Sequence, residues 1–201
     1  MPRDLPRTLS VPLWLLGRKG RKDRVVLLLA LALSAIVPGS AEVPILAAET
    51  RFAPGTEDSA VARTIGGIAS YTRWPEPTPT LHVCVAGAVH HADRLGEAAR
   101  TAGRPVTVRR LGVGTAPGGC DLLYLGAMRP AESLGMIRAT HGRAILSIAE
   151  SDPACRGGAM FCLVVGASSI GFRINIDAIS RSALRVDPRV QRVATLTGGG
   201  N

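Results

Sequence analysis

Aromatic residues are scarce in this sequence. They make up 3% of the 201 residues, although hydrophobic residues make up 46%. The core must therefore be built mainly from Ala, Val, Leu and Ile, and a chain of this length can still bury one sizeable core. Nucleic-acid interfaces usually combine clustered basic side chains with aromatic side chains. The shortage of aromatic residues argues against that class of function.

Lysine is absent after residue 41, where seventeen arginines stand against thirteen acidic residues. Residues 1–41 hold seven of the 24 Lys and Arg residues and two acids, so this segment carries more than half of the net charge of +9. Apart from the pair Arg109-Arg110, the later arginines are scattered. The charge pattern therefore indicates a basic leader and no nucleic-acid partner.

Motifs for catalysis and metal binding are also missing. The turn that begins at Gly87 has no G-x-G-x-x-G pattern, and no serine lies in a G-x-S-x-G elbow. The four histidines and four cysteines lack zinc-ligand spacing, and solvated histidines are the simpler interpretation. No nucleophile, base and orienting group can be grouped from the pattern. We therefore expect no enzyme, no cofactor and no metal site.

Residues 1–41 have the pattern of a secretory signal peptide. Basic residues from Arg18 to Arg24 precede the apolar segment 25–37, which is shorter than the roughly twenty residues that cross a bilayer. Small residues at Gly39-Ser40-Ala41 are the first candidate for cleavage, and Leu46-Ala47-Ala48 is the second. Export is the prediction, and an uncleaved anchor is the alternative.

The rest of the chain alternates between strand and helix patterns. Residues 42–56 are predicted to be a loose linker, residues 57–195 a single domain and residues 196–201 a flexible tail. The predicted strands are 81–87, 105–111, 120–126 and 144–149. The predicted helices are one that starts at Glu57 or Asp58 and is ended by Tyr71–Pro75, then 89–102, 130–141 and a short one after Asp187-Pro188. This order predicts a three-layer α/β sandwich with a mostly parallel mixed sheet.

An antiparallel hairpin is predicted at the C-terminal side of this sheet. The apolar run Phe161–Val165 precedes a small-residue turn and the alternating segment Ile170–Ile176. Asp177 is expected to end the second strand and to cap a helix over Ala178–Leu184.

Four cysteines in an exported chain predict two disulfides, and three pairings are possible. Cys84 and Cys120 lie in the first and third predicted strands, which are commonly neighbours in a doubly wound sheet. Cys155 and Cys162 enclose a short loop that contains Gly157-Gly158. The pairing Cys84–Cys120 with Cys155–Cys162 is therefore favoured, and loop entropy assigns about 3.8 kcal/mol to the first bridge and about 2.5 to the second.

Taken in order, several segments resemble the YfiR family. They are Tyr71–Pro75, Leu81–Val85, Cys120–Gly126, Ile145–Glu150 and Phe172–Asp177. The resemblance covers residues 57 to 195 and includes the four-cysteine layout. It implies a non-enzymatic periplasmic protein that represses a membrane diguanylate cyclase by binding its periplasmic portion. It further implies relief of repression by an OmpA-like outer-membrane lipoprotein or by reduction of the disulfides, and we expect a homodimer.

A repressor of this kind needs an exposed apolar patch with a polar rim. We expect it around Phe172, Ile176, Leu184 and Val186, with Arg173 and Arg185 on the rim. The alternative is that these apolar residues belong to the core, because alternation alone does not say which of them stay exposed. A second function class is a small-ligand sensor, with a pocket near Gly87, Gly126 and Glu150 at the carboxyl ends of the strands.

Overall fold

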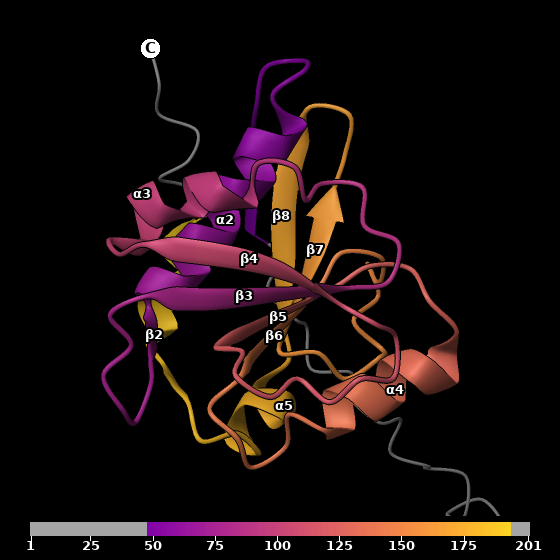
Figure 1. The fold of residues 1–201 in the computed structure, drawn as a ribbon. Helices are drawn as coiled ribbons and strands as arrows, with labels where there is room; N and C mark the ends of the chain where they lie inside the picture. The colour runs from indigo at the N-terminus through magenta and orange to yellow at the C-terminus, as the bar shows by residue number, and fades with distance from the viewer. Residues whose placement is uncertain (1–47, 194–201) are drawn as a thin grey trace, which may run out of the picture. The chain divides into compact units, whose positions relative to one another are not determined.

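Seven strands form one sheet in the computed structural model, which describes residues 48–193 (Figure 1). The strand order is β1-β8-β7-β6-β5-β3-β4. Neighbours from β4 to β7 run parallel, whereas β8 pairs antiparallel with β7 and with β1. The strands are β1 (Ala48–Arg51), β3 (Leu81–Ala86), β4 (Val106–Leu111), β5 (Leu122–Leu125), β6 (Leu146–Ala149), β7 (Phe161–Val165) and β8 (Ser169–Ile174).

Helices cover both faces of the sheet (Figure 1). Helices α2 (Glu57–Ser70) and α3 (Ala98–Ala102) pack with one set of strand residues, which includes Val83 and Tyr124. Helix α4 (Pro130–Arg138) packs with the residues that alternate with them, such as Cys84 and Leu123. Because successive strand residues point to opposite faces, these two clusters lie on opposite sides of the sheet. The predicted three-layer α/β sandwich with a C-terminal hairpin is confirmed.

Short elements complete the domain. The strands β2 (Thr72–Arg73) and β9 (Arg185–Val186) form a second, two-stranded sheet. A 3₁₀ turn η3 (Leu95–Glu97) leads into α3, and a 3₁₀ helix η4 (Pro188–Arg192) follows β9. The Asp187 carboxylate accepts a hydrogen bond from the Arg189 N–H, and Pro188 is the first residue of η4. The predicted start signal at Asp187-Pro188 is confirmed.

Two adjacent glycines in α2 allow other segments to pack very closely. A Cβ on Gly66 would lie 2.4 Å from the carbonyl oxygen of Ala98, and one on Gly67 would lie 2.6 Å from Cγ1 of Val193. The packing partners are α3 and the segment after η4.

The predicted loose linker 42–56 is wrong for residues 48–51, whereas residues 52–56 contain no helix or strand. Residues 48–51 form β1 and pair with β8 in the register Thr50↔Ile170. The strand β1 is too short for an alternating pattern to be recognised in the sequence. Its conformation depends on pairing with the edge of β8. The predicted leader 1–41 and tail 196–201 lie outside the described residues.

The predicted helix 89–102 begins later than expected. Its first half is irregular, and regular structure starts at Leu95. The Ala88 N–H donates to the Ala127 carbonyl, and the N–H groups of His90 and His91 donate to the Glu150 carboxylate. These tertiary hydrogen bonds hold the segment in a loop, and its apolar spacing did not reveal them.

The helix after the hairpin also begins elsewhere. Helix α5 spans Ile176–Ser180, and its N-cap is Asn175, whose Oδ1 accepts a hydrogen bond from the Ala178 N–H at 2.9 Å. Asp177 was the predicted cap and lies in the first turn instead. Ile176 therefore leaves the strand pattern, and its side chain is 71% exposed.

Candidate functional site

A buried carboxylate organises the edge of the sheet where the parallel strands end. Glu150 follows β6 and is 9% exposed. It accepts hydrogen bonds from the His90 N–H at 2.7 Å, from the His91 N–H at 3.4 Å and from the Tyr124 hydroxyl at 2.7 Å. Three donors offset the cost of burying its charge. This network explains why the loop after β3 stays folded over the sheet edge.

The network extends to the start of α2. The His91 ring lies 2.8 Å from the Asp58 carboxylate, measured from Nδ1 to Oδ1. Burial and the neighbouring Glu150 raise the pKa of Tyr124, so its hydroxyl stays protonated and serves as a donor. The sequence pattern did not mark Tyr124 or Asp58 as site residues. A tyrosine in an otherwise apolar strand was the available signal, because a buried hydroxyl needs a partner.

Gly87 and Gly126, the two glycines of the predicted pocket, lie where two backbone segments cross at close range. Gly87 has φ +80°, and a Cβ there would lie 2.9 Å from the Ala127 carbonyl oxygen. A Cβ on Gly126 would lie 2.1 Å from the carbonyl oxygen of Ala88. These contacts surround the bridge between Ala88 and Ala127. A side chain at either position would therefore collide with the backbone of this crossing.

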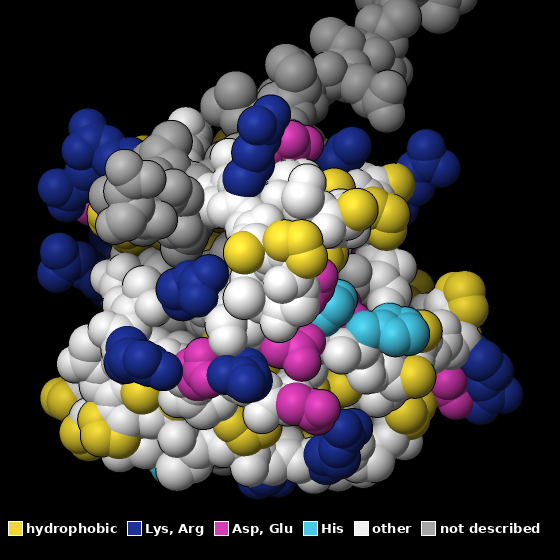
Figure 2. Space-filling view, turned by 90° about the horizontal axis from the view of Figure 1, so that it is seen from above, with side chains coloured by type: hydrophobic (Ala, Val, Ile, Leu, Met, Phe, Trp, Pro, Cys, Tyr) yellow, Lys and Arg dark blue, Asp and Glu magenta, His cyan; other side chains and the backbone are white. Residues whose placement is uncertain are grey.

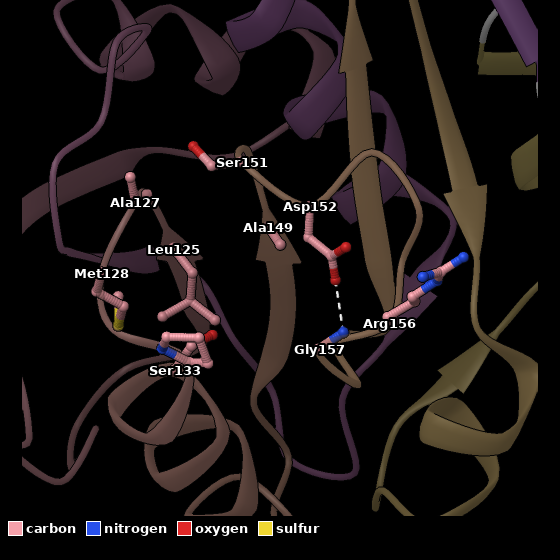
Figure 3. Close-up of a pocket in the computed structure, with 11 residues that line it drawn as sticks. Leu125, Ala127, Met128, Ser133, Ala149, Ser151, Asp152, Arg156 and Gly157 are labelled. Carbon is pink, nitrogen blue, oxygen red and sulfur yellow. Dashed lines mark hydrogen bonds between the residues drawn. The ribbon is translucent and has the colours of Figure 1, made fainter.

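A cavity of about 420 Å³ lies beside this crossing, at the ends of β5 and β6 (Figure 3). Gly126 lines it, whereas Gly87 and Glu150 are not among its lining residues. Leu125, Met128 and Ala149 give it apolar walls, and Ser133, Ser151 and Asp152 add polar groups. Asp152 Oδ2 accepts a hydrogen bond from the Gly157 N–H at 2.6 Å. The size and mixed lining suit a small molecule.

Both predicted disulfides are formed. Cys84–Cys120 has an S–S distance of 2.02 Å, and Cys155–Cys162 has one of 1.95 Å. The first bridge joins β3 to the segment just before β5, and the second closes the loop before β7. All four cysteines are buried on the α4 face. No free cysteine remains.

The predicted partner patch does not form as expected. Phe172 is fully buried and Leu184 is 5% exposed, and both belong to the core on the α2 face. Phe172 is in edge-to-face contact with Phe161, so the core alternative holds for these two residues. Ile176 and Arg185 are exposed, while Arg173 and Val186 are partly exposed. Of the four apolar residues in the predicted site, Ile176 in α5 is therefore the one that is well exposed.

Over the middle of the face shown in Figure 2, basic side chains lie among acidic, histidine and neutral side chains, and several basic side chains gather at its upper left edge. Within residues 48–193, no three His, Cys, Asp or Glu side chains are grouped so that they could hold a metal ion. The same residues contain no helix with the length and apolar character needed to cross a membrane.

Residues 58–195 match the YfiR/HmsC-like family, and the chain belongs to that family. The YfiR/HmsC-like proteins are periplasmic regulators that act with membrane diguanylate cyclases, and they form a regulatory rather than a catalytic family. The resemblance inferred from the sequence is confirmed over almost the same range.

Solved structures with some similarity are larger enzymes. An aspartate aminotransferase from Thermus thermophilus is 13% identical with a TM-score of 0.44, over 74% of this chain and 47% of that one. A phosphoserine aminotransferase from Cytophaga hutchinsonii is 14% identical with a TM-score of 0.41, over 80% and 46%. This chain thus spans less than half the length of either enzyme, and likeness at this level supports no functional conclusion.

Proposed function

We propose that this protein is a periplasmic repressor that binds the periplasmic portion of a membrane diguanylate cyclase and lowers cyclic-di-GMP. Family membership over residues 58–195 is the observation that carries the proposal. Two disulfides that join buried cysteines support an oxidising compartment. The predicted signal peptide at 1–41 supports export. The disulfides also give the protein a means of responding to reducing conditions.

The partner surface is proposed to be centred on Ile176. Its side chain is 71% exposed at the start of α5, although a large apolar side chain gains by burial. Arg185 and the partly exposed Arg173 and Val186 complete the exposed part of the predicted site. An apolar anchor with a charged rim is the usual anatomy of a transient protein interface.

The test compares two exposed apolar residues. Ile176→Asp should abolish repression and raise cyclic-di-GMP in cells that express the cognate cyclase, without changing secretion or the melting temperature. Val113→Asp is the matched control, because Val113 is 44% exposed in a loop outside the proposed surface. Repression that survives Ile176→Asp would remove this surface from the proposal. Loss of repression by both variants would show a general effect of charge.

A small-ligand sensor is the second candidate function, and the cavity lined by Ser133 and Asp152 favours it. Native mass spectrometry of protein purified from the periplasm should then find a bound small molecule. A cavity-filling variant, Ser133→Trp, should lose that mass while keeping its fold. Protein that is free of ligand in both forms would speak against this function.

A further inference from the structure

Arg109 lies directly against one of the two disulfides. Its Nη2 is 3.3 Å from Sγ of Cys120, and the same nitrogen donates a hydrogen bond to the Gly118 carbonyl. The sheet register explains this position, because Arg109 of the edge strand β4 stands opposite Cys84 of β3. Register partners in adjacent strands project to the same face, so the guanidinium reaches the bridge across the sheet edge.

The guanidinium is the charged group that contacts this bridge. Cys84 is fully buried and Cys120 is 6% exposed, so water screens the sulfur atoms poorly. The neighbouring Asp121 carboxylate is engaged elsewhere, since it accepts from the His82 N–H and lies 2.8 Å from Nδ1 of the His82 ring. Arg109 is itself exposed on the edge strand, but its Nη2 lies at the buried sulfur. A cation next to a sulfur stabilises that sulfur as a thiolate.

The second bridge has a different environment. Cys155 Sγ is close to the Ala159 carbonyl oxygen, at 3.9 Å. Arg173 is the register partner of Cys162, but within residues 48–193 no arginine N–H donates to either sulfur of Cys155–Cys162. The two disulfides of one domain thus differ in whether an arginine N–H donates a hydrogen bond to a bridge sulfur.

Reduction by a dithiol proceeds through two exchange steps. A thiolate of the dithiol bonds to one bridge sulfur, the protein S–S bond breaks, and its electron pair leaves with the other sulfur as a thiolate. The second thiolate of the dithiol then attacks the mixed disulfide and releases the remaining cysteine. The dithiol loses two electrons and becomes a cyclic disulfide, while the two cysteines gain them and take up protons according to the pH. The equilibrium does not depend on which sulfur is attacked first.

We propose that Arg109 tunes the Cys84–Cys120 disulfide by stabilising the Cys120 thiolate, so that this bridge is reduced at a higher potential than it would be without the guanidinium. The oxidised state gains little from the same contact, because a disulfide sulfur is a weak hydrogen-bond acceptor. The differential interaction therefore favours the reduced form. This inference deepens the redox part of the proposed function, yet it is tested on the isolated protein and can fail or hold independently of cyclase binding.

The experiment measures each bridge separately. Wild-type protein and Arg109→Gln are equilibrated with reduced and oxidised dithiothreitol over a range of ratios, quenched with acid, alkylated and mapped by mass spectrometry. Arg109→Gln should need a reduced-to-oxidised ratio several-fold to roughly tenfold higher for half-reduction of Cys84–Cys120, and a tenfold change corresponds to about 30 mV. The Cys155–Cys162 bridge of the same molecules is the internal reference and should not change.

Arg110→Gln is the matched control. Arg110 is the next residue of β4, is exposed and points to the other face. Arg110→Gln should leave the half-reduction ratio at the wild-type value. Arg109→Lys should give a ratio between those of wild type and Arg109→Gln, because lysine keeps the charge without the planar fork. In reduced protein, the alkylation rate of Cys120 should depend on pH with a midpoint that rises in Arg109→Gln.

The direction in which the half-reduction ratio changes distinguishes tuning of the disulfide by Arg109 from a purely structural role. If Arg109 only holds the loop at Gly118, its removal loosens the bridge region and makes reduction easier. An unchanged ratio, or easier reduction of Arg109→Gln, would overturn the proposal. So would an equal shift in the Cys155–Cys162 bridge, because that bridge has no contact with Arg109.

Discussion

The two faces of the sheet are held together by different means. On the α2 face, α2, α3, α5 and η4 all contribute buried apolar side chains to one large cluster. On the α4 face, α4 contributes Met136 and Ile137, and all four cysteines lie in this smaller cluster. Hydrocarbon packing dominates the first face, and covalent cross-links supplement a thin helix layer on the second. Reducing conditions should therefore loosen the α4 face while the α2 face keeps most of its stabilisation.

The largest expected effect comes from placing a charge in the α2-face core. Leu184→Asp should unfold the protein, because Leu184 is 5% exposed and an unpaired buried carboxylate costs several kcal/mol or more. Thermal unfolding of secreted protein measures this, and Ile176→Asp is the control at an exposed position. A folded Leu184→Asp protein would mean that Leu184 is not part of the core.

Removing the bridges one at a time tests the α4 face. Replacing Cys84 and Cys120 with serine should lower the free energy of unfolding by about 3.8 kcal/mol, whereas the same change at Cys155 and Cys162 should cost about 2.5 kcal/mol. Urea unfolding under non-reducing conditions measures both. The reverse order of stability would show that the short loop before β7, and not the link between β3 and β5, limits the stability of this face.

Removing the buried Tyr124 hydroxyl, which donates to Glu150, should have a smaller effect on stability. Tyr124→Phe should destabilise the protein by about 1–2 kcal/mol, because Glu150 loses one of its donors inside a poorly solvated site. Tyr71→Phe is a control, since Tyr71 is only partly buried. A loss that is equal at both positions would exclude a special role for the Glu150 network.

The raised pKa of Tyr124 predicts that the stability of the protein depends on pH. The pKa of this tyrosine is raised in the folded protein, so the unfolded state releases the phenolic proton first. Stability from this group is complete below the unfolded pKa, about 10, and is lost as the pH rises above that value. Stability measured from pH 8 to 11 should fall more steeply for wild type than for Tyr124→Phe. Parallel curves would contradict this assignment.

The smallest effect distinguishes the two glycines of α2. Alanine is favoured over glycine inside a helix by about 1 kcal/mol. At Gly66 the new Cβ would meet a backbone carbonyl, so Gly66→Ala should be net destabilising. At Gly67 it would meet the Val193 side chain near the end of the domain, which can shift, so Gly67→Ala should be close to neutral. Chemical denaturation of both variants checks the difference.

Much of the fold could be predicted from the local pattern of apolar residues. The apolar runs in β3, β5 and β6 and the alternation of Ile170 and Phe172 placed these strands correctly, because strand burial leaves a direct periodic signal. The disulfide pairing also followed, since neighbouring strands bring Cys84 and Cys120 together. These features follow from the burial of single strands and from the order of the strands along the chain.

Features that depend on distant residues could not be predicted. The loop at His90 is irregular because Glu150, sixty positions later, binds its N–H groups. Asn175 and Asp177 are both good caps, and only the end of the β8 pairing decides between them. For the same reason the alternating segment could not show that Phe172 is buried, and both Phe172 and Leu184 lie in the core on the α2 face.

The position of β1 has a consequence for the proposed cleavage of the leader. Its four residues pair with β8 from Ala48 opposite Phe172 to Arg51 opposite Ser169. Cleavage after Ala41 would leave the whole strand and its register intact, whereas cleavage after Ala48 would place a free amino group at Glu49 and remove one pair. Under the proposed export, the choice of cleavage site thus also sets how much of the outermost strand the mature protein retains. Comparing the melting temperatures of proteins that begin at Glu42 and at Glu49 would measure what that strand residue contributes.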